Sequence, residues 1–238
     1  MSIPRPWLQD FLFDAVRPAA PTDLPPLTRP VSHQEVRSVA ASENHDPLIL
    51  LPDGIPRKHL YLQLDTDVMP REMYIRRTVA EKLLKAQEQL PLGFSLLALD
   101  TWRTMDAQRE LMRIYSAEDP QMREGSVSNA DDPVLLPPHT TGGAIDLTLA
   151  FEGQGLPLGA DFDEFGEVAD ANYFETLPAS APAADVLARD LRRLLTGVLG
   201  EQGFAPYAQE WWHFSYGDQR WAAQYGREHS LYRTVTPN

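Results

Sequence analysis

Two short segments that lie far apart in the chain each carry candidate metal ligands, and a shared metal ion would require them to meet in the fold. The first runs from His139 to Asp146, and the second contains Glu210 and His213. Zinc in a catalytic site takes three protein ligands from nitrogen and carboxylate oxygen and leaves a fourth position to water. His139, Asp146 and His213 supply such a set, while Glu210 is left free to act as a base. The sequence therefore predicts one zinc ion per chain in a hydrolase.

The residues around these ligands predict where the backbone must bend. Residues 144–149 alternate as a half-buried strand does, and Asp146 lies on one face of it. In a flat strand His139, seven residues earlier, would point to the opposite face, so a bend is required, and Gly142-Gly143 permits it. In the second segment the acid and the histidine are offset by three, which does not suit a flat strand and predicts a bulge or turn.

The remaining apolar patterns predict an α+β fold. Helices are expected over residues 76–90, 106–115 and 184–202, a strand over 93–100, and a hairpin from a strand over 144–151 through a turn at 152–155. A last strand carries the second ligand segment. This order of elements favours a single domain with a central antiparallel sheet flanked by helices and the zinc site at the sheet.

The N-terminal quarter of the chain differs from the rest in composition. Residues 1–56 hold ten of the 21 prolines and predict an arm that wraps a catalytic domain of residues 57–238. Apolar residues at near-helical spacing within the arm predict a short amphipathic helix; they are Trp7, Leu8, Phe11, Leu12 and Val16. Such a helix would pack on the core or form a homo-oligomer through the arm, and disorder of the arm is the alternative.

Composition excludes several classes of partner. The net charge is −13, from 34 acidic and 21 basic residues, whereas nucleic acids and anionic membranes require clustered positive charge. There is no cysteine, so zinc must bind through nitrogen and oxygen. The first residues lack the apolar run of a signal peptide, and no stretch approaches the roughly 20 apolar residues of a membrane span. A cytoplasmic location is therefore the default expectation.

Taken together, the motifs resemble those of a known family. The pattern His-x-x-Gly-x-Ala-x-Asp at residues 139–146, followed by Glu-Trp-Trp-His-Phe at 210–214, resembles the D-alanyl-D-alanine dipeptidase family of zinc peptidases. Residues 100–103, Asp-Thr-Trp-Arg, and residues 159–165 also match, in the same order, and the resemblance covers roughly residues 45–225. It implies a hydrolase with one zinc ion that activates water to cleave D-alanyl-D-alanine, a small D,D-dipeptide, into two D-alanines.

The resemblance also implies a role for each matching residue. The zinc ligands would be His139, Asp146 and His213, the general base Glu210, the oxyanion-stabilising cation Arg103, and the carboxylate for the substrate's free amino group Asp163. Two positions depart from the family, because Pro137 and Thr104 stand where a serine and a proline are common. The departure at Pro137 leaves the shape of the substrate pocket open.

Two other functions remain open at this stage. A zinc D,D- or L,D-carboxypeptidase that acts on longer peptidoglycan stem peptides would share the metal residues, and an open cleft would favour it. A non-catalytic, zinc-retaining binding module is the other alternative, but a structural zinc site would need neither Glu210 nor Arg103. The sequence does not distinguish D-alanine salvage, cell-wall turnover and antibiotic resistance as the physiological role.

Several other residues have structural interpretations. Trp211 and Trp212 are expected to be packing groups, because large aromatic side chains dominate buried area. Asp161 and Glu164 are expected in a solvated loop. The remaining histidines lack a second candidate ligand at a useful spacing and are expected to be structural or exposed; they are His33, His45, His59 and His229.

Overall fold

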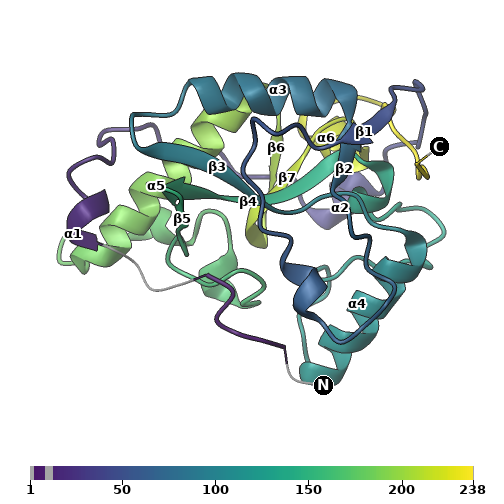
Figure 1. The fold of residues 1–238 in the computed structure, drawn as a ribbon, viewed down its shortest axis with the longest axis horizontal. Helices are drawn as coiled ribbons and strands as arrows, with labels where there is room; N and C mark the ends of the chain where they lie inside the picture. Colours follow the sequence, from purple (N-terminus) through teal and green to yellow (C-terminus); the bar gives the residue numbers. More distant parts are fainter. Residues whose placement is uncertain (1–2, 9–12, 238) are drawn as a thin grey trace.

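A five-stranded antiparallel sheet lies at the centre of the computed structural model, which describes residues 3–8 and 13–237 (Figure 1). Its strands are β3 (Phe94–Asp100), β4 (Ala144–Phe151), β5 (Gln154–Gly155), β6 (Ala205–Tyr207) and β7 (Glu210–Ser215). The order is β3-β4-β7-β6, and β5 pairs with the end of β4. A separate pair, β1 (Leu48–Leu50) with β2 (Tyr74–Arg76), was not predicted. The predicted α+β class with an antiparallel sheet is confirmed.

Three long helices surround this sheet, and all three were predicted. They are α3 (Arg77–Glu88), α4 (Met105–Glu118) and α5 (Ala183–Glu201). Helices α3 and α5 pack against each other on one side of the sheet, and α4 lies on the other (Figure 1). Thr104 caps α4 by accepting a hydrogen bond from the backbone N–H of Ala107. None of the helices in the described part of the chain is long and apolar enough to cross a bilayer.

The short helices other than α1 were not predicted from the sequence, because each is too brief to show a periodic pattern. They are α1 (Phe13–Val16), α2 (His33–Val36), α6 (Gln219–Gln224), and the 3₁₀ turns η1 (Leu60–Gln63), η2 (Pro138–Thr141), η3 (Glu167–Ala169) and η4 (Tyr173–Thr176). Two of them, η2 and α6, contribute residues to the site described below.

The central strand β4 is buried on both faces, so the prediction of a half-buried strand was wrong. Every residue from Ala144 to Ala150 is buried. The segment that follows β5 covers one face of the strand. There the hydroxyl of Thr148 donates a hydrogen bond to the carbonyl oxygen of Leu156 at 2.6 Å. Asp146 therefore lies in the interior, where its charge requires partners.

The N-terminal residues pack into the main core. Trp7 is 2% exposed and makes edge-to-face contacts with Tyr61 and Phe162. The backbone N–H groups of Trp7 and Leu8 donate to the carboxylate of Asp161 at 2.7 and 2.9 Å. The expectation of a merely solvated Asp161 was therefore wrong, because the carboxylate binds this segment.

The helix expected in the arm is seen over part of its length. In the described part, helix α1 covers only Phe13–Val16, and Trp7 and Leu8 precede it in a bend. Phe11 and Leu12, which the same prediction included, lie outside the described residues. The domain boundary at residue 56 and the oligomer through the arm stay predictions.

Replacing Trp7 with alanine should measure how strongly this segment is bound. Because the indole is fully packed, we expect the Trp7→Ala variant to lose about 3–5 kcal/mol in the free energy of unfolding, the usual range for a buried tryptophan. Leu92, which is 98% exposed, gives the matched control, and Leu92→Ala should change stability by less than about 0.5 kcal/mol. Equal urea-unfolding midpoints for the two variants would show that the segment is not bound in solution.

Candidate active site

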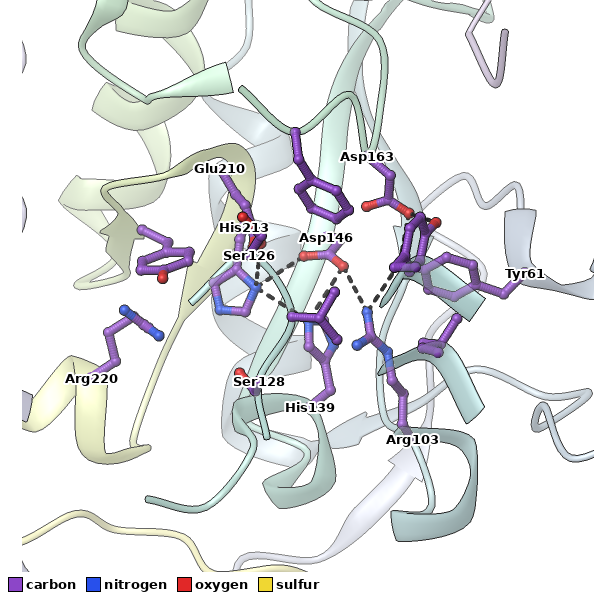
Figure 2. A pocket seen from close by; sticks show the side chains of 15 residues that line it. Tyr61, Arg103, Ser126, Ser128, His139, Asp146, Asp163, Glu210, His213 and Arg220 are labelled. Atoms are coloured by element: carbon purple, nitrogen blue, oxygen red, sulfur yellow. Dashed lines mark hydrogen bonds and ion pairs between the residues drawn. The ribbon is translucent and has the colours of Figure 1, made fainter. Parts of the chain in front are cut away.

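Adjacent strands and one turn bring the candidate metal ligands together. Asp146 on β4 lies directly opposite His213 on β7 in the antiparallel register. His139 lies in η2, and the chain then turns at Gly142, whose φ of 70° is a conformation that glycine adopts without strain. The bend expected between the first two ligands is therefore present. Figure 2 shows the three side chains pointing at one another in the middle of a pocket.

The spacing of the ligand atoms fits a zinc ion. His213 Nδ1 lies 3.0 Å from Asp146 Oδ1 and 3.2 Å from His139 Nε2, and His139 Nε2 lies 3.3 Å from Asp146 Oδ2. Two ligand atoms bound tetrahedrally to zinc at 2.0–2.1 Å would lie about 3.3 Å apart. The donor set of two nitrogens and a carboxylate is also one that catalytic zinc prefers.

The surroundings of the ligands also favour metal binding. The ring Nδ1 of His139 lies 2.6 Å from the carbonyl oxygen of Thr101 and donates to it, which leaves the Nε2 lone pair facing the site. Burial lowers the pKa of His213 to about 4, so this imidazole is neutral. Burial opposes ionisation of Asp146, but the two histidines outweigh it and hold its pKa well below the usual range.

The buried charged groups around the ligands suit a divalent cation. Four buried carboxylates and two buried arginines gather here; they are Asp100, Asp146, Asp163, Glu210, Arg103 and Arg220. Buried charges are costly unless they are balanced. With all six groups ionised, these described residues would carry an excess of two negative charges, which one bound Zn²⁺ ion would neutralise.

Glu210 occupies the position expected of a base. Tyr207 pairs with Glu210 although the preceding Pro206 pairs with Phe214, and this register shift confirms the predicted bulge. Glu210 Oε2 lies 3.7 Å from the Nδ1 atom of His213, beside the ligand set but outside it. Burial, followed by the charges of Asp146 and Asp163, raises the pKa of Glu210 well above its ordinary value.

Arg103 is held rigidly at the edge of the metal site. Its Nε donates to Asp100 at 2.7 Å and its Nη1 to Gln108 at 3.0 Å. Its Nη2 is shared between Asp146 at 3.2 Å and the hydroxyl of Tyr61 at 3.3 Å. Although burial opposes the charge, these acceptors raise the pKa of Arg103 above its ordinary value, so the guanidinium remains charged.

Asp163 lines the pocket beside Tyr61 and Tyr115. Its carboxylate is 2% exposed and accepts hydrogen bonds from the hydroxyls of Tyr61, at 2.9 Å, and Tyr115. Burial raises the pKa of Asp163 to about 7, because two neutral donors do not offset the loss of water. This carboxylate therefore lacks the cationic partner that would fully stabilise its charge.

Together these side chains line a single pocket. It contains about 410 Å³ of space between the atoms, with the mouth included. Arg103 and Asp163 lie on one side of the metal ligands in Figure 2, and Arg220 lies on the other. The structure thus brings all six predicted site residues together, although their roles in catalysis stay predictions.

Several residues of the site were missed by the sequence reasoning. Asp100 orients both Arg103 and His139, whose Nδ1 lies 3.3 Å from it, and its place three residues before Arg103 was the available signal. Tyr61 and Tyr115 gave no local signal, because only the tertiary fold places them beside Asp163.

Among the described side chains, the histidines and tryptophans that were expected to be structural or exposed lie outside the ligand set. His45 and His229 are exposed, whereas His59 is partly buried and lies 3.4 Å from Asp100, so it supports the site indirectly. Trp211 and Trp212 are buried in the main core, as expected of packing groups.

Comparison with known proteins gives a consistent set of relatives. The peptidase M15 family model, described as D-ala-D-ala dipeptidase, matches residues 65–232. A D-alanyl-D-alanine dipeptidase of Synechocystis sp. is 30% identical over 75% of this chain and 84% of its own length. A D-alanyl-D-alanine dipeptidase of Enterococcus faecium is 29% identical over 62% of this chain and 75% of its own length. The solved LD-carboxypeptidase LdcB overlaps with a TM-score of 0.39 at 19% identity, over 77% of this chain and 73% of that one, a likeness too partial for inference.

Proposed function

Because the chain belongs to the peptidase M15 family of D-Ala-D-Ala dipeptidases, we propose that it hydrolyses D-alanyl-D-alanine to two D-alanines at one zinc ion. The observation that carries the proposal is the buried set of His139, Asp146 and His213, with Glu210 beside it and unbound to it. A metal site with a free carboxylate next to it is the arrangement that hydrolysis of an amide requires.

The site residues divide the chemistry between them. Zinc, when bound, supplies a Lewis acid that polarises the scissile carbonyl and lowers the pKa of water from 15.7 to about 7. Glu210 accepts the proton of the attacking water and delivers it to the departing amine. Arg103, fixed by Asp100 and Gln108, directs positive charge at the oxygen on which negative charge develops.

Asp163 supports the proposal that the substrate is a dipeptide. A dipeptide carries a free ammonium group one residue before the scissile bond, and a buried carboxylate binds such a group by a charge-assisted hydrogen bond. In a longer peptide the same nitrogen is an uncharged amide that gives Asp163 no counter-charge. The buried position of Asp163 in the pocket lining thus favours a dipeptidase over a carboxypeptidase. A cytoplasmic location and a role in peptidoglycan metabolism remain predictions.

Blocking the amino group tests this assignment. We expect N-acetyl-D-Ala-D-Ala to be cleaved with a kcat/KM at least about 10²-fold below that of D-Ala-D-Ala, because the acetylated nitrogen leaves Asp163 buried without a counter-charge. The Asp163→Ala variant should narrow this gap by impairing cleavage of the free dipeptide. Steady-state kinetics on both substrates measure the effect.

The matched control is Asp161→Ala, which removes a carboxylate two residues away that binds the N-terminal backbone rather than the pocket. In this variant the ratio of kcat/KM for D-Ala-D-Ala to kcat/KM for N-acetyl-D-Ala-D-Ala should stay within about threefold of the wild-type ratio. Equal or better cleavage of the acetylated peptide by the wild-type enzyme would reject the dipeptidase in favour of the carboxypeptidase on longer stem peptides.

A further inference from the structure

Arg220 is a buried cation that forms no direct ion pair with any described residue, although the carboxylate of Glu210 lies close enough for its pKa to be lowered by the charge of Arg220. It lies in α6 and is 6% exposed. Its Nε and Nη1 atoms are buried and have no hydrogen-bond partner, and none of the ion pairs in the described part of the chain involves it. The guanidinium is stacked 3.6 Å from the centre of the Tyr207 ring, which holds it in place without neutralising it.

The site around Arg220 is the pocket of the metal ligands. Arg220 lines that pocket, and in Figure 2 its guanidinium extends toward His213 from the side opposite to Asp163 and Arg103. The hydroxyl of Ser126, another lining residue, is also buried without a hydrogen-bond partner. Both unpartnered groups are able to donate hydrogen bonds, so this side of the pocket is suited to an anion.

Two buried guanidinium nitrogens without a hydrogen-bond partner are costly, so Arg220 requires an explanation beyond packing. A guanidinium removed from water with unpaired N–H donors destabilises the fold unless a ligand pairs them. Buried polar groups left unpaired in a pocket are commonly groups that a ligand satisfies. Planar guanidinium groups bind carboxylates in bidentate geometry, which makes a carboxylate the natural anion here.

We propose that Arg220 binds the C-terminal carboxylate of the substrate. The proposal rests on the proposed function and assigns the second end of the same dipeptide. A zwitterionic dipeptide would place its ammonium group at Asp163, its scissile carbonyl between the metal ligands and Arg103, and its carboxylate at Arg220. The pocket would then select substrates with a free carboxyl terminus immediately after the scissile bond, and peptides extended or amidated at this end would be rejected.

The test compares D-Ala-D-Ala with D-alanyl-D-alaninamide, in which the carboxylate is replaced by a neutral amide. Wild-type enzyme should cleave the amide with a kcat/KM at least about 10²-fold lower, because Arg220 is then left without its counter-charge. Arg220→Met should lower kcat/KM for D-Ala-D-Ala, the acid, by at least about 30-fold, mainly by raising KM. The same variant should change kcat/KM for D-alanyl-D-alaninamide, the amide, by less than about threefold. Arg220→Lys should recover part of the preference for the acid.

Two measurements separate this role from a structural one. Zinc content should be unchanged in Arg220→Met, and Arg113→Met, which removes an exposed arginine paired with Glu110 on α4, should leave both substrates unaffected. An equal decrease in kcat/KM for the acid and the amide in Arg220→Met would overturn the proposal. So would wild-type enzyme that cleaves both substrates equally, a result that stands even if the variant does not fold.

Failure of the proposal and failure of the proposed function give different results. If the enzyme cleaves N-acetyl-D-Ala-D-Ala better than the free dipeptide, the dipeptidase assignment fails, and the comparison of acid with amide is then made on the acetylated peptide. If the wild-type enzyme prefers the acid and Arg220→Met does not, the result would still support Arg220 as the carboxylate site. Absence of that preference would overturn it.

Discussion

Removal of zinc is expected to reduce hydrolysis of D-Ala-D-Ala below detection, and its return to restore the activity. The expected loss is complete because the remaining groups do not polarise the scissile carbonyl or lower the pKa of water by themselves. The His213→Ala variant should lose both zinc and activity, since one of three ligands is removed. His229→Ala, which alters an exposed histidine, is the matched control and should retain both.

Elemental analysis and activity measured on the same samples provide the test. One zinc ion per chain is expected in the active enzyme, and the activity should follow the zinc content during chelation. The fold itself should persist, because the sheet and its helices form a hydrophobic core without the ion. Fully active enzyme that contains no metal would refute the proposed mechanism.

Replacement of Glu210 by glutamine should lower kcat by at least about 10²-fold while zinc remains bound. Glutamine preserves the size of the side chain but cannot accept a proton from water, and removal of a general base typically costs 10²–10⁴-fold. Zinc binding should survive, because Glu210 lies next to the ligand set and is not part of it.

Glu201→Gln provides the control, since it makes the same chemical change at an exposed position near the end of α5. It should leave kcat and zinc content unchanged. If Glu210→Gln instead lost its zinc with the fold intact, Glu210 would be a ligand, and the roles of base and ligand would have to be reassigned.

Local patterns in the sequence predicted the elements whose residues repeat regularly. Helices α3, α4 and α5 and strands β3 and β4 are long enough for their apolar periodicity to be recognised. The pair β1 and β2 is only three residues long in each strand, and it depends on pairing between segments distant in the sequence. The burial of both faces of β4 likewise depends on a segment that returns over it, which alternation within the strand does not reveal.

The site was predictable to the extent that its residues lie in contiguous motifs. His139 and Asp146 share one segment, and Glu210 and His213 share another, so their types and spacing identified them together. Tyr61, Tyr115 and Arg220 are isolated residues on separate elements. Their importance depends on contacts made in the folded chain, and a tyrosine or arginine alone in a sequence has many uses.

The sheet carries the metal ligands and the base on and beside β4 and β7, whereas the two ends of the pocket are formed by segments outside the sheet. Asp163 lies in the loop after β5, and Arg220 lies in α6. Selection can therefore act on these peripheral segments independently of the strands that hold the metal. Under the proposed assignments, a change of specificity between free dipeptides and longer peptides would be accessible in evolution by substitutions outside the sheet, with the hydrolytic machinery inherited unchanged.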